Sequence, residues 1–320
     1  MRPLRLLVLH LAASAVVDAQ CCTETSEDAD YGDAEGHYTV IVGGTSNSAD
    51  GVSSTIIGGI SNIVGGGETK NGAGSSTVTS VGGSAVGGSG NVAEGPSSSV
   101  VGGASNAASA EYAAAVGGSE NAAAGYYSAI VGGAGNSASA QYAAAFGGSR
   151  NAAAASYSTV VGGSGNSAFA EYAAAAGGSG NAATGYMSTV VGGARNSVFG
   201  MYAAAVGGYG NTATGSSSTL VGGYKNNATA YSSTVVGGGW NAASAYSSTV
   251  VGGGWNAASA YSSTVVGGDW NTASAFSSTV VGGYCNTAST WDAAAVGGSE
   301  NAATEYSSTV VGGSVNTASE

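Results

Sequence analysis

The chain repeats a 15-residue unit. Residues 246–260, YSSTVVGGGWNAASA, are identical to residues 231–245. A Gly-Gly pair recurs every 15 residues from Gly87-Gly88 to Gly312-Gly313, and an Asn stands three residues after each pair. Two further copies begin earlier, at Gly43-Gly44 and Gly58-Gly59. A short fixed period is typical of a solenoid, in which each unit buries its apolar side only against its neighbours.

The composition alone resembles that of a flexible linker, since the chain has 58 Gly and only 8% charged residues. The order of the residues argues against disorder. Aliphatic residues recur at fixed places in the unit, Pro occurs only twice, and 43% of the residues are hydrophobic. Such a chain can offset its conformational entropy by burying apolar surface, so we expect the repeat to fold.

We number the positions of a unit from its Tyr, so that Tyr246 is position 1, Gly252-Gly253 are positions 7 and 8, and Asn256 is position 11. Two strand patterns are visible, at positions 2–6 (SSTVV) and 11–15 (NAASA), with turns between them. The unit is too short for a βαβ motif, and no helical periodicity is present. The sequence therefore predicts an all-β fold, a parallel β-solenoid of 15-residue coils with two short strands per coil and ladders about 4.8 Å apart.

Strand alternation predicts which positions face inward. Position 5 is always aliphatic and position 13 is always Ala or Val, so these two positions should form the core. Positions 3 and 11 then share the interior, and we expect the Asn side chains at position 11 to form a ladder of hydrogen-bonded amides. The Gly-Gly pair suits a turn with backbone angles that other residues resist.

The repeat occupies residues 37–320, and two other segments precede it. Residues 1–19 have two Arg before an apolar stretch and a small-residue cleavage site, as in a signal peptide. Residues 20–36 form an acidic segment or cap. An extra Gly82-Gly83 breaks the register at about 66–86, where we expect one turn to be distorted or looped out. We expect a secreted, extracellular or cell-surface protein without a membrane span, because no later stretch reaches about 20 apolar residues.

The net charge of −12 and only six basic residues argue against nucleic acid as a partner. The cysteines are Cys21, Cys22 and Cys285. Cys21 and Cys22 could pair with other chains, or with Cys285, or stay unpaired, and the odd number leaves these alternatives open.

Alternation places positions 4 and 6 on the outside, where Thr or Ala and then Val recur. An outward Thr-x-Val strip is a larger apolar surface than soluble monomers usually expose, so we expect it to contact a partner. The strip is uninterrupted in residues 218–281. Its predicted interaction face consists of Thr219, Val221, Thr234, Val236, Thr249, Val251, Thr264, Val266, Thr279 and Val281.

Aromatic residues also form columns. Trp240, Trp255 and Trp270 occupy position 10 of successive units, and Tyr231, Tyr246 and Tyr261 occupy position 1. These columns could bind sugar rings, or they could stack on one another and stiffen the turns. Asn227 is the only Asn in an N-x-[ST] sequon and is therefore a possible glycosylation site. We expect low occupancy there, on the assumption that its side chain lies in the buried Asn ladder.

We expect no catalytic residues, no metal site and no cofactor. After residue 19 the only His is His37, and the carboxylates occupy varying turn positions. The Gly-Gly turns also lack the Asp residues of calcium-binding β-roll repeats. The sequence therefore argues against an enzyme.

The pattern STVVGGxxNxAxA over residues 37–320 resembles the head repeats of trimeric autotransporter adhesins. The resemblance implies a left-handed β-roll and a trimer whose axis buries Thr249, Val251 and their equivalents. The present unit is one residue longer, and we find no coiled-coil stalk or membrane-anchor domain, which argues against that bacterial secretion route. The pattern is also similar to the grass-type ice-binding β-roll, which has inward Asn and Val and an outward Thr/Val face on ice.

These observations favour a secreted, non-enzymatic, adhesin-like structural, cell-surface or matrix protein. Its partner would be another copy of the chain, in a homo-oligomer such as a trimer, or an extended surface such as glycan or matrix. The alternative is an ice-binding protein that uses the same face on ice.

Overall fold

The computed structural model describes residues 39–65, 69–71, 75–77 and 82–319. The predicted signal peptide, the acidic segment and both N-terminal cysteines lie outside these residues. The described chain is an all-β parallel solenoid without a helix. It divides into two units, with the boundary between Tyr142 and Ala143, and each unit is described by itself.

Unit 1 contains six coils, each with a three-residue strand followed by a two-residue strand. The longer strands are β1 (Val40–Val42), β3 (Thr55–Ile57), β7 (Ser84–Val86), β9 (Ser99–Val101), β11 (Ala114–Val116) and β13 (Ala129–Val131). The shorter strands are β2 (Ser48–Ala49), β4 (Ile63–Val64), β8 (Val92–Ala93), β10 (Ala107–Ala108), β12 (Ala122–Ala123) and β14 (Ser137–Ala138).

Unit 2 contains twelve coils of the same kind. Its longer strands are β15 (Ala144–Phe146), β17 (Thr159–Val161), β19 (Ala174–Ala176), β21 (Thr189–Val191), β23 (Ala204–Val206), β25 (Thr219–Val221), β27 (Thr234–Val236), β29 (Thr249–Val251), β31 (Thr264–Val266), β33 (Thr279–Val281), β35 (Ala294–Val296) and β37 (Thr309–Val311). Its shorter strands are β16 (Ala152–Ala153), β18 (Ser167–Ala168), β20 (Ala182–Ala183), β22 (Ser197–Val198), β24 (Thr212–Ala213), β26 (Asn227–Ala228), β28 (Ala242–Ala243), β30 (Ala257–Ala258), β32 (Thr272–Ala273), β34 (Thr287–Ala288), β36 (Ala302–Ala303) and β38 (Thr317–Ala318).

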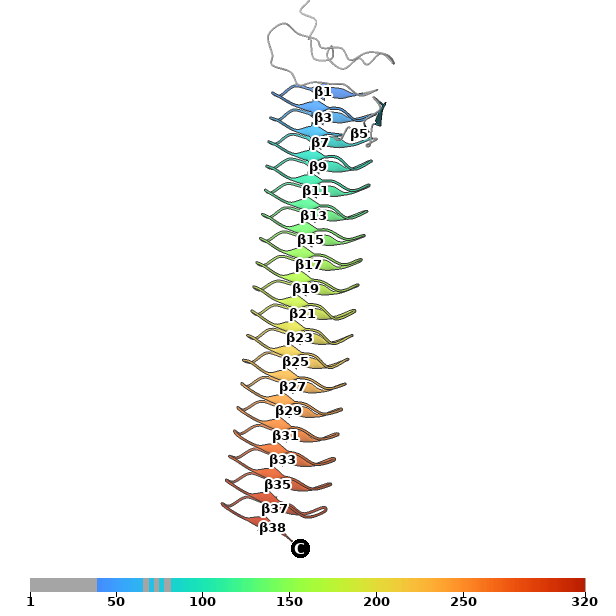
Figure 1. Ribbon diagram of the computed structural model, residues 1–320. Helices are drawn as coiled ribbons and strands as arrows, with labels where there is room; N and C mark the ends of the chain where they lie inside the picture. The colour runs from blue at the N-terminus through green and yellow to red at the C-terminus, as the bar shows by residue number, and fades with distance from the viewer. Residues whose placement is uncertain (1–38, 66–68, 72–74, 78–81, 320) are drawn as a thin grey trace, which may run out of the picture. The chain divides into compact units, whose positions relative to one another are not determined.

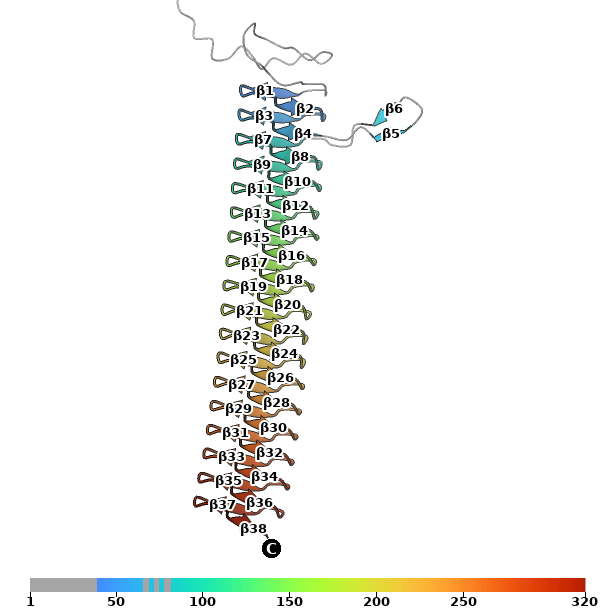
Figure 2. The ribbon, with the colours of Figure 1, turned by 60° about the vertical axis from the view of Figure 1, so that its left-hand side comes forward.

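Within each unit, equivalent strands of successive coils pair in parallel, each residue with the residue 15 positions later except from β3 to β7 and from β4 to β8. In unit 2, Thr249 pairs with Thr264 and Val251 with Val266, and Ala258 of β30 pairs with Ala273 of β32. Figure 1 shows the odd-numbered strands of unit 2 stacked one above another, and Figure 2 shows the even-numbered strands as a second stack beside them. The register puts the same repeat position of every coil into one column.

The predicted alternation is confirmed. At positions 5 and 13, Val250 and Ala258 are fully buried, and so are Ser248 at position 3 and Asn256 at position 11. Thr249 at position 4 is half-buried and Val251 at position 6 is exposed. The core of each coil is therefore a thin layer of small and β-branched side chains between the two strand stacks.

The strands are shorter than predicted, because they cover positions 4–6 and 12–13 instead of 2–6 and 11–15. Positions 2 and 3 belong to a turn, in which Ser248 N–H donates to the Ala245 carbonyl at 3.0 Å. Ser247, at position 2, has a φ of 54°, which ends the extended conformation. Position 9 adds an isolated parallel bridge, such as Gly239 to Gly254, that the sequence analysis did not include.

The buried Asn side chains form a ladder, although its bonds differ from those predicted. The Asn256 side-chain oxygen accepts from the backbone N–H of Asn271 at 3.0 Å. Its Nδ2 donates to the carbonyls of Gly252 at 3.1 Å and Gly268 at 2.7 Å. Direct amide-to-amide bonds occur in only some coils, for example from Asn121 to Asn106 at 3.1 Å. The Asn column therefore mainly satisfies backbone groups of the Gly-Gly turns in its own and the next coil.

The irregular segment is an insertion within a single coil. Thr55 of β3 pairs directly with Ser84 of β7, a step of 84 − 55 = 29 residues, which exceeds the 15-residue unit by 14 residues. Within the insertion, β5 (Thr69–Asn71) and β6 (Ser75–Thr77) pair antiparallel. Gly82 and Gly83 occupy positions 2 and 3 of the next coil, and are not a second Gly-Gly turn. The described residues between β4 and β7 therefore add no coil to either strand stack.

Candidate interaction surfaces

The predicted Thr and Val residues come together on one surface of unit 2. They belong to β25, β27, β29, β31 and β33, which pair in this order in parallel and in register. We call their outward side chains the Thr/Val face. Within it the five Val side chains, from Val221 to Val281, are each 37–39% exposed. The Thr side chains between them are half-buried.

The Thr/Val face carries no charge. Every described strand residue at positions 4 and 6 of unit 2 is Thr, Ala, Val or Phe. The described charged side chains of unit 2 lie outside the strands, as in Glu171, Lys225 and Asp292. A partner that covers this face therefore removes methyl groups and Thr hydroxyls from water without desolvating an ion.

The even-numbered strands present a different outer surface, which we call the second face. It consists of the side chains at positions 12 and 14, such as Ala257 and Ser259 in one coil and Thr272 and Ser274 in the next. In the coils of β30 and β32 these side chains are shorter or more polar than the Val row, whereas Phe169 and Phe199, at position 14 of two earlier coils, are each 54% exposed. In the coils of β30 and β32 the second face therefore offers less apolar surface to a partner than the Thr/Val face does.

Asn227 lies on the second face, and the assumption that it belongs to the buried ladder is wrong. The ladder residue of this coil is Asn226, which stands three residues after the Gly-Gly pair and is fully buried. Asn227 is the next residue, at position 12 of β26, and its side chain is exposed. The expectation of low occupancy at the sequon therefore loses its physical basis.

The three Trp side chains of position 10 stack on one another. The rings of Trp240 and Trp255 are 4.9 Å apart at 4°, and those of Trp255 and Trp270 are 5.0 Å apart at 3°. The Lys225 ammonium lies 4.3 Å from the centre of the Trp240 ring, a cation–π contact at one end of this column. Both faces of Trp255 are therefore covered by neighbouring indoles.

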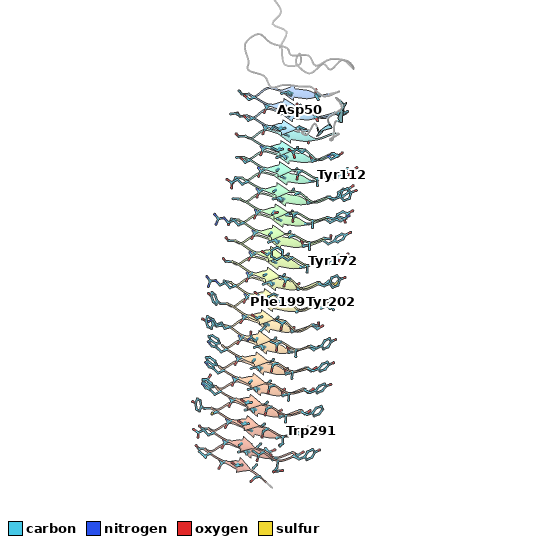
Figure 3. The ribbon with its side chains drawn as sticks, in the orientation of Figure 1. Asp50, Tyr112, Tyr172, Phe199, Tyr202 and Trp291 are labelled. Carbon is cyan, nitrogen blue, oxygen red and sulfur yellow. The ribbon has the colours of Figure 1, made fainter. Side chains whose placement is uncertain are left out.

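The Tyr column at position 1 has the same arrangement. Tyr231 and Tyr246 stack at 5.2 Å and 12°, and Tyr246 and Tyr261 at 4.9 Å and 1°. Figure 3 shows Tyr172, Tyr202 and Trp291 along one edge of unit 2. A sugar ring that stacks on an aromatic side chain needs a free ring face, and the central rings of both columns have none. The geometry therefore favours self-stacking over sugar binding, with each pair contributing about 0.5–1.5 kcal/mol.

The backbone at position 10 also has a conformation that the sequence analysis missed. Trp240, Trp255 and Trp270 have φ values of 57°, 55° and 60°. This left-handed conformation costs about 1–2 kcal/mol for a residue with a side chain. The Trp255 N–H donates to the Gly239 carbonyl of the preceding coil at 2.9 Å, which together with ring stacking offsets this cost. Gly at position 10 in other coils, such as Gly165 and Gly180, was the available signal.

Two tyrosines outside these columns have altered acidity. Desolvation raises the pKa of Tyr186, and Tyr202 and Glu171 nearby raise it further. In unit 1, desolvation likewise raises the pKa of Tyr126, with Tyr127 and Glu111 adding to the effect. Both phenols are therefore neutral at neutral pH and add no charge to the edges on which they lie.

The described part of the chain holds no group of three or more His, Cys, Asp or Glu side chains that could bind a metal ion. Cys285 is exposed and forms no disulfide with another described residue. No helix among the described residues is long and apolar enough to cross a membrane.

Comparison with known proteins adds no family assignment, because no protein-family model and no curated protein matches the sequence. The resemblance to adhesin head repeats and to ice-binding β-rolls therefore rests on the residue pattern and on the solenoid fold.

Proposed function

We propose that this protein is a secreted, non-enzymatic, adhesin-like structural protein that self-associates through the Thr/Val face. The observation that carries the proposal is the uncharged, in-register row of exposed Val side chains on five successive coils. Apolar surface of this extent on a soluble protein usually marks an interface.

The periodicity of the face favours another copy of the chain as the partner. Rows of Thr and Val recur at the coil spacing of about 4.8 Å, so side chains interdigitate along the whole face only with a surface of the same spacing. A second copy has that spacing by construction, and a symmetric oligomer brings identical patches together. The resemblance to adhesin heads supports a trimer as the form of this oligomer.

The test is a pair of charge substitutions on adjacent coils. In the double variant Thr249→Lys with Thr264→Lys, association buries ammonium groups against methyl groups, which costs several kcal/mol. We expect the association constant to fall by about 100-fold or more. The matched control, Ser259→Lys with Ser274→Lys, places the same charges on the second face and should leave association unchanged.

Sedimentation equilibrium measures the molecular mass in solution of the wild type, the control and the Thr249/Thr264 variant, and so gives the oligomeric state of each. The proposal predicts an oligomer for the wild type and the control, and a monomer for the Thr249/Thr264 variant. A monomeric wild type, or a Thr249/Thr264 variant that remains an oligomer, would contradict it.

Ice binding is the second candidate function, and one observation favours it. The five Thr residues from Thr219 to Thr279 pair in register, so hydroxyl and methyl groups form a regular, uncharged lattice on a sheet. On this hypothesis the wild type is a monomer and slows ice recrystallisation. The Thr249/Thr264 variant should lose that activity while the control keeps it, and a wild type without any effect on ice would exclude the hypothesis.

A further inference from the structure

The sequon at Asn227 stands at an unusual place in the repeat. Position 12 holds Thr212 in the coil before and Ala242 in the coil after, and both pair in register with Asn227. Those two side chains are half-buried, whereas Asn227 is exposed. Thr229, the hydroxyl residue of the sequon, is exposed at position 14 of the same coil. The acceptor amide and the hydroxyl thus both lie on the second face.

Ladder asparagines could not carry a sugar in the folded protein. Asn226, the direct neighbour, donates from Nδ2 to the carbonyls of Gly222 at 3.4 Å and Gly237 at 3.2 Å. A glycan on that nitrogen would remove these bonds and would have to enter the core. None of the ladder asparagines has a Ser or Thr two residues later, and the only N-x-[ST] sequon of the chain begins at Asn227.

The Asn227 amide is not needed by the fold. No hydrogen bond to its side chain is formed within the described residues, and its backbone N–H pairs with the Asn241 carbonyl at 2.8 Å. The strand ladder is therefore complete without the side chain. A large substituent on the side-chain nitrogen leaves the ladder and the core of the coil intact.

We infer that Asn227 carries an N-linked glycan, which shields the second face of unit 2 around β26. In the transfer, a bond forms between the Asn227 Nδ2 and the anomeric carbon of a polyprenyl-diphosphate-linked oligosaccharide. The bond from that carbon to the diphosphate breaks, the diphosphate departs, and the amide loses one proton. The modification takes place on the extended chain, and the outward position of Asn227 lets the modified chain fold.

The glycan has a consequence for assembly, which rests on the proposed function. A bulky, hydrated oligosaccharide at Asn227 blocks close packing on the second face of several coils. The Thr/Val face lies on the other stack of strands and stays uncovered. The glycan would thus restrict association to the Thr/Val face and oppose uncontrolled stacking of solenoids.

The experiment measures the intact mass of the full chain after passage through a eukaryotic secretory pathway behind a proven signal peptide. Treatment with peptide-N-glycosidase should lower the mass of the wild type. Asn227→Gln and Thr229→Ala should both have the lower mass before treatment, whereas Thr229→Ser keeps the acceptor and should show the shift. A reporter glycoprotein in the same cells confirms that the host modifies sequons.

Two results would overturn the inference: a wild-type mass that the glycosidase does not change while the reporter shifts, or a shift that persists in Asn227→Gln. Circular dichroism of Asn227→Gln should match the wild type, since the side chain has no structural partner. The result is independent of self-association, because the mass shift depends on the sugar and not on the oligomer. A shifted protein that stays monomeric would support the glycan and contradict the proposed function.

Discussion

Single Asn and Gly residues stabilise the contact between successive coils. The carbonyl groups of the turn at positions 7 and 8 point toward the buried Asn side chains of position 11. The Asn at position 11 supplies the donors for these carbonyls and one acceptor for the next coil. The Gly-Gly turn therefore needs the Asn at position 11 as a hydrogen-bond donor, and for this reason the Gly-Gly pair and the Asn recur together.

We expect Asn256→Ala to destabilise the protein. The substitution leaves the Asn271 N–H without its partner, and a buried group left unpaired costs about 1–3 kcal/mol. It also removes one of two donors from the Gly252 and Gly268 carbonyls, which keep the Asn241 amide and the Gly254 N–H respectively. We expect the free energy of unfolding to fall by about 1–3 kcal/mol or more in denaturant titration. Asn227→Ala is the matched control, since its exposed side chain has no partner, and should change stability by less than about 0.5 kcal/mol. Equal effects of the two substitutions would contradict the ladder.

The two glycines of a turn should respond differently to the same substitution. Gly252 and Gly253 both have positive φ, 69° and 72°. A Cβ on Gly252 meets open space, whereas a Cβ on Gly253 meets the Gly268 carbonyl oxygen and the Asn256 amide. Gly252→Ala should therefore cost only the left-handed backbone penalty of about 1–2 kcal/mol.

Gly253→Ala adds a steric conflict between coils to the same backbone penalty, so we expect a clearly larger loss of stability. The measurement is the melting temperature of each variant, and we expect that of Gly253→Ala to be the lower of the two. A melting temperature that is the same for both would mean that the coils are not in close contact at position 8.

At the level of the strand, alternation separates a thin core from the outer face. Val250 is fully buried and Val251 is 37% exposed, although the two are neighbours of the same type in β29. Val250→Asp places a carboxylate without a partner in the core, at a cost of several kcal/mol. We expect the β signal in circular dichroism to be lost from the neighbouring coils and the melting temperature to fall.

The control for this prediction is Val251→Asp, which puts the same group in contact with water and should leave the monomer folded. If Val250→Asp had the melting temperature of the wild type and Val251→Asp did not, position 6 and not position 5 would face the core.

The strands also show what could be predicted from the sequence. The inward positions of Val250, Asn256 and Ala258 followed from the period of two, which a strand imposes on its side chains. The strand ends did not follow, because residues as different as Ser247 and Tyr172 share the positive φ of position 2. At that position the contacts between coils determine the backbone conformation, and the residue type does not reveal it.

The two remaining differences have separate causes. Gly82-Gly83 has the appearance of a turn pair, and only the pairing of β3 with β7 shows that it stands in another part of the coil. For Asn227 the signal was present in the sequence, since only the first residue of Asn226-Asn227 has the ladder spacing from the Gly-Gly pair. The outward positions of the Thr and Val residues followed from alternation, whereas their role as an interface stays a prediction. Sequence reasoning could not decide whether the aromatic columns were stacked.

At the scale of the whole molecule, repetition makes one surface chemistry extend over many coils. A weak contact between one Thr-x-Val unit and a partner is multiplied by the number of coils that present it in register. We therefore expect the Thr/Val face to be covered in the assembled protein while the second face stays in contact with solvent.

Cysteine labelling of the two faces tests this claim most directly. In a protein with Cys21, Cys22 and Cys285 replaced by Ser, Val251→Cys and Ser259→Cys each place one thiol on a known face of adjoining strands. We predict that at high protein concentration a maleimide reagent modifies Val251→Cys much more slowly than Ser259→Cys. The two rates should converge on dilution. A Val251→Cys rate that does not depend on protein concentration would contradict the claim that this face forms the interface.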